Sequence, residues 1–181
     1  MFVPKNLFLT KGVGKHRQKL TSFEAALRNA GIAHLNIVRV SSILPPQAKI
    51  LPKNKSIARL SAGAITYTVM AECCTNEPHR LIAASIGVAI PRDRTQYGYL
   101  SEYHSFGETE IKAADKAEDL AAQMLATTLG VPFDPETSYD ERKEIWKIST
   151  EIVKAMEITQ TAIGDKNGLW TTVIAAAVFI P

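Results

Sequence analysis

The residues with the most distinctive chemistry are two adjacent serines, Ser41 and Ser42, which follow a β-branched run and precede Pro45 and Pro46. A serine hydroxyl can attack the carbonyl of the peptide bond before it when a tight turn holds the two groups together. The attack exchanges the amide for an ester. Elimination of the ester leaves dehydroalanine, which hydrolyses to a pyruvoyl group and ammonia. The serine pair therefore allows self-cleavage between residues 41 and 42.

A serine pair also has a simpler interpretation. Serines at the end of a strand commonly hydrogen-bond the backbone of an ordinary turn, and the two prolines stiffen the chain just beyond. For an isolated pair this interpretation is the stronger one, so the segments around the serines decide between the two.

Two elements are expected to position the pair. Residues 34–40 alternate in polarity and are rich in β-branched side chains, which predicts a strand that ends at the serines. Residues 21–24, Thr-Ser-Phe-Glu, have the form of a capping box, which predicts a short helix that ends at Gly31. A phosphate-binding P-loop would need glycine where Leu9 stands and Ser or Thr where His16 stands, so we interpret residues 12–16 as a glycine-rich loop after a strand.

The rest of the chain predicts further strands and one long helix. A second capping box at 105–108 is expected to open a helix to Leu129, stopped by Gly130, with Ile111, Ala114, Ala117/Ala121 and Leu125 on its apolar face. We expect a loop over 131–140 and a helical turn within 141–148. Strands are expected over 6–10, 62–72, 80–90, 95–104, 149–163 and 169–180, the last two forming a hairpin around a turn at 164–168. This order predicts an α+β fold with a largely antiparallel sheet system.

Composition excludes several classes of protein. The chain has 181 residues, the length of one ordinary domain, with 46% hydrophobic and 22% charged residues. It lacks the ~20 consecutive apolar residues of a membrane span and a recognisable signal peptide, so we expect a cytoplasmic protein. Cys73 and Cys74 are expected to be reduced and structural, because a disulfide between neighbours is strained. The cysteines and histidines show no metal-ligand spacing, and we expect no metal.

Charge is distributed unevenly along the chain. Residues 1–60 contain eleven Lys or Arg and a single acid, Glu24, whereas residues 61–181 contain ten bases and seventeen acids. A basic first third is compatible with a nucleic-acid-binding arm, although this part of the chain contains no known binding motif and few aromatic residues.

Several motifs together resemble one enzyme family. The segments are SFEAALRNAGI at 22–32, NIVRVSSILPP at 36–46, IGVAIP at 86–91 and GYLSEY at 98–103. In this order and at these separations they closely resemble the pyruvoyl-dependent arginine decarboxylases, and the similarity extends from about Leu7 to the final strand. The resemblance favours self-cleavage over an ordinary turn.

The resemblance implies a fold, an assembly and a reaction. The fold would be a single-domain four-layer αββα sandwich, assembled as homotrimers with active sites between protomers. Cleavage between Ser41 and Ser42 would give a β chain of residues 1–41 and an α chain of residues 42–181, with a pyruvoyl group made from Ser42. That covalent group would form a Schiff base with L-arginine and release CO2 and agmatine, with no pyridoxal phosphate and no metal.

The resemblance assigns the proton donor of this reaction to Glu102. Its expected strand places the carboxyl on the same face as Leu100 and His104, where desolvation would raise the carboxyl pKa and suit a general acid. A surface glutamate at a strand end is the alternative.

The resemblance also gives Asn36 a role in self-processing, as a donor to the developing oxyanion. Six extended residues cover ~20 Å, so Asn36 cannot reach its own Ser42 unless the chain bends. We therefore expect it to act across a subunit boundary or after a sharp bend. A local hydrogen bond at an edge strand is the alternative.

Glu24 matches the family carboxylate that holds the substrate guanidinium, a pairing that can be bidentate. The family more often has aspartate at this position. Glu24 alternatively completes a capping box with Thr21.

The sequence leaves other functions open. The same mechanism could act on another amino acid, such as histidine. A non-enzymatic nucleic-acid-binding or scaffold domain is the alternative from a different class. Intact mass separates these classes, because only a self-processing enzyme gives two fragments.

Overall fold

The computed structural model describes residues 3–130 and 152–180. The strands and helices, in chain order, are β1 (Asn6–His16), α1 (Lys19–Asn29), β2 (Asn36–Arg39), β3 (Ile43–Leu44), β4 (Lys49–Ile50), α2 (Lys53–Ile57), β5 (Ile65–Thr75), β6 (Leu81–Pro91), β7 (Gly98–Phe106), α3 (Glu110–Leu129), β8 (Ile152–Ile163) and β9 (Trp170–Ile180).

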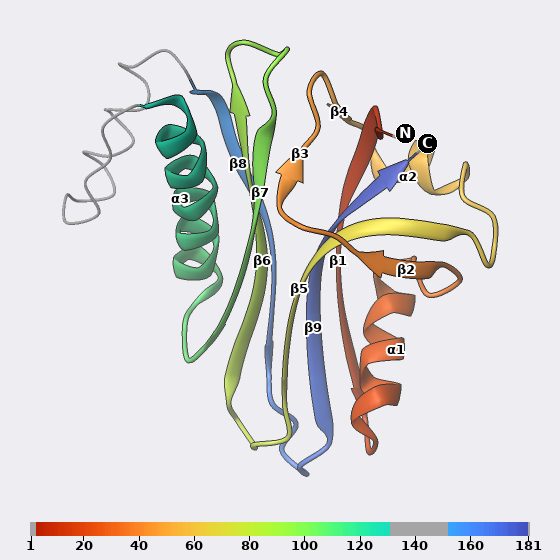
Figure 1. Cartoon of the computed structure of the whole chain (residues 1–181). Coiled ribbons are helices and arrows are strands. Elements are labelled where there is room, and N and C mark those ends of the chain that lie inside the picture. Colours follow the sequence, from red (N-terminus) through yellow and green to blue (C-terminus); the bar gives the residue numbers. More distant parts are fainter. Residues whose placement is uncertain (1–2, 131–151, 181) are drawn as a thin grey trace.

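The strands form two sheets that stack face to face. One sheet has the order β2-β5-β9-β1-β4 and the other the order β3-β7-β6-β8. Helix α1 covers the outer face of the first sheet and α3 covers the outer face of the second, so the layers run α, β, β, α across Figure 1. The predicted α+β class and four-layer sandwich are confirmed.

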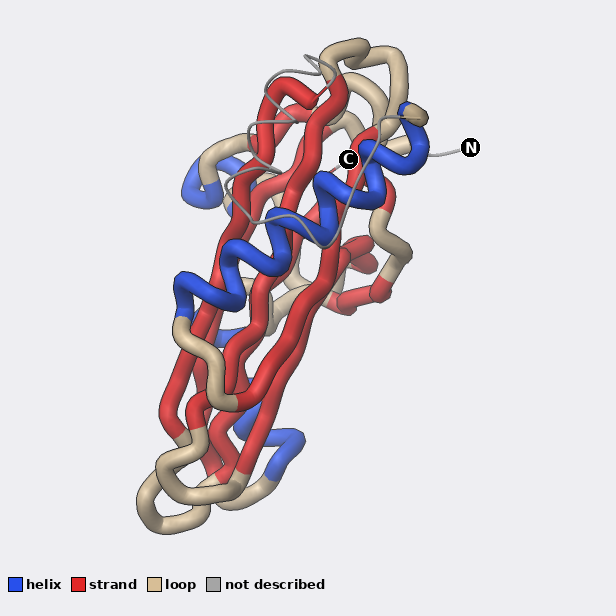
Figure 2. The backbone as a smooth tube through the Cα atoms, turned by 90° about the vertical axis from the view of Figure 1, so that its left-hand side faces the viewer, coloured by secondary structure: helices blue, strands red, loops and turns tan. Residues whose placement is uncertain are grey.

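The main hydrophobic core fills the space between the sheets. It includes Leu44, Val69, Ile86, Leu100 and Val173, all nearly inaccessible to solvent. Strand β6 is buried along nearly its whole length, because the other sheet covers one face and α3 crosses the other diagonally (Figure 2). The continuous apolar run at 80–90 is thereby explained.

Glycines allow each helix to lie unusually close to its sheet. A Cβ at Gly12 or Gly14 of β1 would stand 2.2 Å from a main-chain oxygen of α1, and one at Gly87 of β6 would stand 2.0 Å from the Ala117 oxygen of α3. The expectation of a glycine-rich loop at 12–16 is therefore wrong. These residues continue β1, and Gly12 and Gly14 are required for the packing of α1.

Both predicted capping boxes are wrong. Helix α1 begins at Lys19, and the Thr21 hydroxyl donates to the Gln18 side chain instead of capping the helix. Ser105 is a buried residue of β7, and Thr109 caps α3 by accepting from the Lys112 N–H. The predicted helix ends are confirmed, since Gly31 and Gly130 both have positive φ at the C-terminal turns.

The buried face of α3 differs from the one that the sequence suggests. Ala117, Ala121 and Leu125 are buried as expected, whereas Ile111 is 73% exposed and Ala113 is buried instead. Small side chains suit this face because α3 lies close to the sheet. Across residues 3–130 and 152–180, the helices are too short or too polar to cross a membrane.

The predicted C-terminal hairpin is also wrong. Strand β8 pairs with β6 in one sheet, whereas β9 pairs with β1 and β5 in the other. The turn at 164–168 therefore carries the chain between sheets. The loop expected at 131–140 and the helical turn at 141–148 lie outside the described residues.

Candidate active site

Ser41 and Ser42 lie in one of the connections between the two sheets, the one from β2 to β3. Just before them, the Val40 N–H donates to the Thr68 oxygen of β5 at 3.1 Å. Just after, the Leu100 N–H of β7 donates to the Ser42 oxygen at 2.8 Å. The peptide bond between the serines thus lies between two anchors, one on each sheet, and Figure 1 shows the chain passing from β2 to β3 at this point.

The carbonyl of this bond has a donor of its own. The Ser41 oxygen accepts a hydrogen bond of 2.9 Å from the N–H of Ile43, two residues along. The bond closes a tight turn over Ser42. Ser41 is exposed and Ser42 is half-buried, so the potential nucleophile and the carbonyl before it share a tight turn, as self-cleavage requires.

Glu102 lies on the same edge of the sandwich. Its Oε1 accepts from the Met70 N–H of β5 at 3.0 Å, which joins β7 to the other sheet. Glu102 is two residues beyond Leu100, a step of about 7 Å along a strand. The prediction of a desolvated carboxyl is wrong for a single chain, because Glu102 is exposed. Its predicted face is confirmed, since its strand partner Ile86 and the adjacent Leu100 belong to the core between the sheets.

We call this region the serine edge, comprising residues 40–43, Thr68, Met70, Leu100 and Glu102. A cavity of about 420 Å³ opens beside it, lined by Pro4, Val40, Ser41, Ile43, Pro45, Tyr67 and Phe179. Apolar side chains also stand exposed around it, among them Val38, Ile43 and Tyr67. The serine pair therefore borders a mostly apolar cavity and surface.

Asn36 lies away from the serines, at the opposite end of β2. Its Nδ2 donates to the Gly63 oxygen at 2.8 Å, and its N–H donates to the Ala64 oxygen. Strand β2 runs straight from Asn36 to Arg39, parallel to β5, so the chain makes no bend that returns Asn36 to Ser42. The local hydrogen bond considered from the sequence is present.

Glu24 also lies apart from the serine edge. It is on α1, where its carboxylate pairs with the Arg28 guanidinium at 2.6 Å. A shallow surface depression of about 440 Å³ surrounds it, lined by Thr21, Glu24, Ala25, Arg28 and Asn29. These residues do not line the cavity beside Ser41, so one chain does not bring Glu24 and Ser42 into one pocket. The neighbouring Phe23 and Leu27 pack on the core under α1.

Sequence reasoning missed three contributors to this site. Arg39, two residues before Ser41, pairs with Glu72 of β5 and lies over the Phe23 ring of α1 at 6.0 Å. The other two are the main-chain N–H groups of Met70 and Ile43. No side-chain pattern reveals a main-chain donor, and the Arg39–Glu72 pair depends on the register of β2 against β5, which the sequence does not provide.

The two cysteines are free thiols, Cys73 buried and Cys74 partly buried. Cys73 is buried between the sheets and its Sγ contacts the Ser105 oxygen at 3.6 Å. Burial raises the pKa of the Cys73 thiol to about 11, which makes it a poor nucleophile at neutral pH. In the described part of the chain, His, Cys, Asp and Glu side chains form no group of three that could hold a metal ion.

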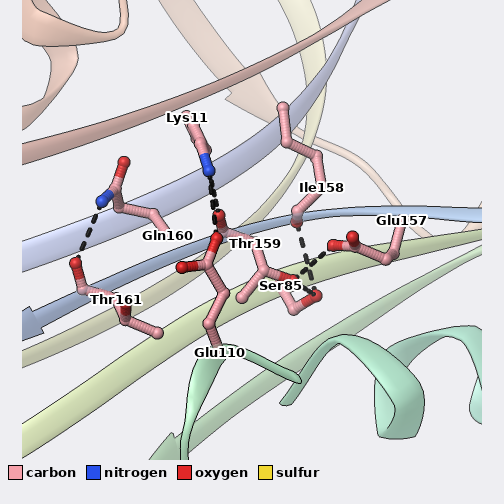
Figure 3. Close-up of polar contacts among 8 residues, drawn as sticks. All are labelled: Lys11, Ser85, Glu110, Glu157, Ile158, Thr159, Gln160 and Thr161. Atoms are coloured by element: carbon pink, nitrogen blue, oxygen red, sulfur yellow. Dashed lines mark hydrogen bonds and ion pairs between the residues drawn. The ribbon is translucent and has the colours of Figure 1, made fainter. Parts of the chain in front are cut away.

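The opposite edge of the sandwich, where β1 faces β8, is closed by polar side chains (Figure 3). Lys11 of β1 donates to the Thr159 main-chain oxygen at 2.7 Å and pairs with Glu110 of α3 at 3.3 Å. On the face of the second sheet that α3 covers, the Ser85 and Thr159 hydroxyls lie 2.6 Å apart, and Thr159 also donates to Glu157. We call these five residues the lysine edge.

The fold and the serine edge together describe an αββα sandwich whose two sheets are joined by a candidate self-cleaving serine pair. The chain belongs to the pyruvoyl-dependent arginine decarboxylases, since the model of that family (PvlArgDC) matches residues 6–181.

Curated relatives agree with this family along the full length. A protein of Chloroherpeton thalassium named probable pyruvoyl-dependent arginine decarboxylase is 58% identical over 180 residues, 99% of both chains. A pyruvoyl-dependent arginine decarboxylase of Nitrosopumilus maritimus is 54% identical over 178 residues, 98% of this chain and 97% of the relative. One named pyruvoyl-dependent arginine decarboxylase 2, from Methanosarcina mazei, is 53% identical with the same coverage.

Proposed function

We propose that this single-domain protein converts L-arginine to agmatine and CO2 after cleaving itself between Ser41 and Ser42 into chains 1–41 and 42–181. The observation that carries the proposal is the serine edge, where the bond between the serines lies between an anchor on each sheet. Family membership supplies the reaction and the substrate.

The residues at this edge fit a pyruvoyl group made from Ser42. The Leu100 N–H that now holds the Ser42 oxygen would hold the amide carbonyl next to the ketone. The adjacent cavity of about 420 Å³ offers room for a small substrate. Once formed, the pyruvoyl ketone acts as an electron sink for the electron pair left by CO2.

Glu102 is the proposed proton donor to the substrate α-carbon. Its carboxyl lies on the same edge as Ser42, and the Met70 N–H fixes one of its oxygens. The second oxygen is left to exchange a proton with the substrate. Because Glu102 is exposed in one chain, the desolvation that favours a general acid would come from the assembled site.

We propose a homotrimer in which sites form between protomers. Asn36 and Glu24 make local contacts away from their own Ser42, so we assign their roles in processing and arginine binding to a neighbouring subunit's site. The exposed apolar residues Val38, Ile43 and Tyr67 beside the serine edge support burial against another copy.

Cleavage would leave chain 1–41 firmly attached. Strand β1 pairs with β9 along its full length, from Asn6 opposite Ile180 to His16 opposite Trp170. Among the described residues, three ion pairs also cross the cleavage boundary, formed by Lys11 with Glu110, Lys15 with Asp165, and Arg39 with Glu72. Three of the seven bases of residues 1–41 are thus paired with acids of the remaining chain.

Replacing Glu24 tests the substrate assignment. We expect Glu24→Gln to raise the KM for arginine far more than it slows self-cleavage, which intact mass follows separately. Glu77→Gln is the matched control, since Glu77 also forms a surface ion pair, with Arg80. Equal effects of Glu24→Gln on KM and cleavage would refute its role in substrate binding.

A further inference from the structure

The Ser41 carbonyl is the group that changes most during self-cleavage. The Ser42 Oγ would bond to the Ser41 carbonyl carbon, and the C=O electron pair would move onto the Ser41 oxygen. As the amide bond to the Ser42 nitrogen breaks, the electron pair returns, and the hydroxyl proton ends on that nitrogen. The product is an ester with a free amine, so atoms and charge balance without another reactant.

A donor aimed at the Ser41 oxygen would stabilise the charge that develops there. The Ile43 N–H lies 2.9 Å from this oxygen, within the range of an effective oxyanion donor. The turn that sets this distance is the common inverse γ-turn, since Ser42 has no positive φ. The contact needs no rearrangement of the chain before the attack.

The strand register explains why this N–H is available. Leu100 donates to the Ser42 oxygen, and Ile43 stands opposite Tyr99, the next pair along. Antiparallel partners alternate between hydrogen-bonded and non-hydrogen-bonded pairs, so Ile43 occupies a non-hydrogen-bonded position. Its N–H points away from β7 and back toward Ser41.

We propose that the main-chain N–H of Ile43 is an oxyanion donor for self-cleavage, an inference that rests on the proposed cleavage between Ser41 and Ser42. Each chain supplies this donor to its own Ser41 carbonyl oxygen. The amide of its own Asn36 is bonded to the Gly63 oxygen, at the opposite end of β2. A neighbouring subunit's Asn36 would then add a second donor to the one already in place.

Proline at position 43 removes the donor with little damage to the sheet. Strand β3 is at the edge of its sheet. An edge strand accepts proline at a position whose N–H points away from the partner strand, as the N–H of Ile43 does. We expect Ile43→Pro to slow self-cleavage about 10²-fold, the cost of one lost oxyanion donor. Ile43→Ala is the reference for this variant, because it also loses the side chain but keeps the N–H, so Ile43→Pro should cleave about 10²-fold more slowly than Ile43→Ala.

A main-chain ester provides a second test without the restraints of proline. Incorporating the 2-hydroxy acid analogue of isoleucine at position 43 replaces only the N–H with oxygen. This ester also makes the Ser42 carbonyl a weaker acceptor for the Leu100 N–H. The control is therefore the 2-hydroxy acid analogue of leucine at position 100, which removes that N–H and leaves the Ile43 N–H in place. We expect slow cleavage from the first substitution and a smaller effect from the second.

Cleavage is followed by intact mass at intervals after cell-free synthesis, with circular dichroism to confirm that each uncut chain is folded. Cleavage of Ile43→Pro about 10²-fold slower than that of Ile43→Ala, together with slow cleavage of the ester at position 43, supports the proposal. Wild-type rates for folded chains that lack the Ile43 N–H overturn it. A wild-type chain that stays uncut refutes the proposed function itself, which is a separate result.

Discussion

The two open edges of the sandwich join the same pair of sheets by different means. At the lysine edge, the Lys11 side chain reaches from β1 to the Thr159 main chain and to Glu110. At the serine edge, the main chain itself crosses between the sheets, and the Met70 N–H binds the Glu102 carboxylate nearby.

The difference indicates which edge can be cut. A connection made of side chains stabilises the sandwich but offers no peptide bond to break. At the serine edge, each side of the bond is anchored separately, Val40 to β5 and Ser42 to β7. Breaking the bond between the anchors leaves both sheets intact, so the serine edge combines a cleavable bond with a structure that survives the cut.

The largest expected effect follows loss of the nucleophile. Ser42→Ala has no hydroxyl to attack the Ser41 carbonyl, so we expect a chain that stays full-length and has no decarboxylase activity. Ser41→Ala is the matched control, because it keeps both the carbonyl and the Ser42 hydroxyl and should still be cut. Fragments from Ser42→Ala, measured by intact mass, would contradict the assignment.

Glu102→Gln should separate cleavage from catalysis. Glutamine keeps an oxygen for the Met70 N–H but cannot donate the acid proton, so we expect normal fragments with kcat reduced about 10²- to 10⁴-fold. Glu110→Gln makes the same chemical change at the lysine edge and should leave kcat unchanged. Similar kcat losses in both variants would remove the distinction between the edges.

Lys11→Met should affect stability alone. It leaves the Thr159 oxygen without its charged donor, which we expect to lower the free energy of unfolding by about 1–2 kcal/mol. Urea unfolding of the processed protein measures this loss, and Lys11→Arg, which keeps the charge, should restore part of it. Slower cleavage by Lys11→Met would show instead that the lysine edge influences the serines.

The smallest effect is expected for the outer member of the lysine edge. Glu110 is 54% exposed in its ion pair with Lys11, and exposed pairs contribute less than about 1 kcal/mol. Urea unfolding of Glu110→Gln should therefore differ from wild type by a few tenths of a kcal/mol. A loss as large as that of Lys11→Met would assign the stability of this edge to the ion pair instead of the main-chain contact.

The sequence indicated candidate residues for the site but not their arrangement in space. Ser41, Ser42 and Glu102 were identified from motifs, and the structure places them on one edge. The prediction that Glu102 is desolvated was wrong for a single chain. Strand parity indicates on which face of the sheet a side chain lies, but not whether other residues cover that part of the face. The distance between Glu24 and the serines depends on layer packing, which no local pattern encodes.

The fold was predicted where local signals suffice. The apolar run of β6, the alternation in β8 and the glycines that end α1 and α3 all indicated their elements correctly. The prediction of a hairpin between β8 and β9 was wrong because a short turn between two strands does not reveal whether they share a sheet. Gly12 and Gly14 were misread because their requirement comes from a helix that packs on β1.

The most direct test of this account is the intact mass of the purified wild-type protein. We expect two fragments, residues 1–41 ending in the Ser41 carboxylate and residues 42–181 with a pyruvoyl group in place of a free N-terminal amine. A single full-length mass from material that decarboxylates arginine would contradict it.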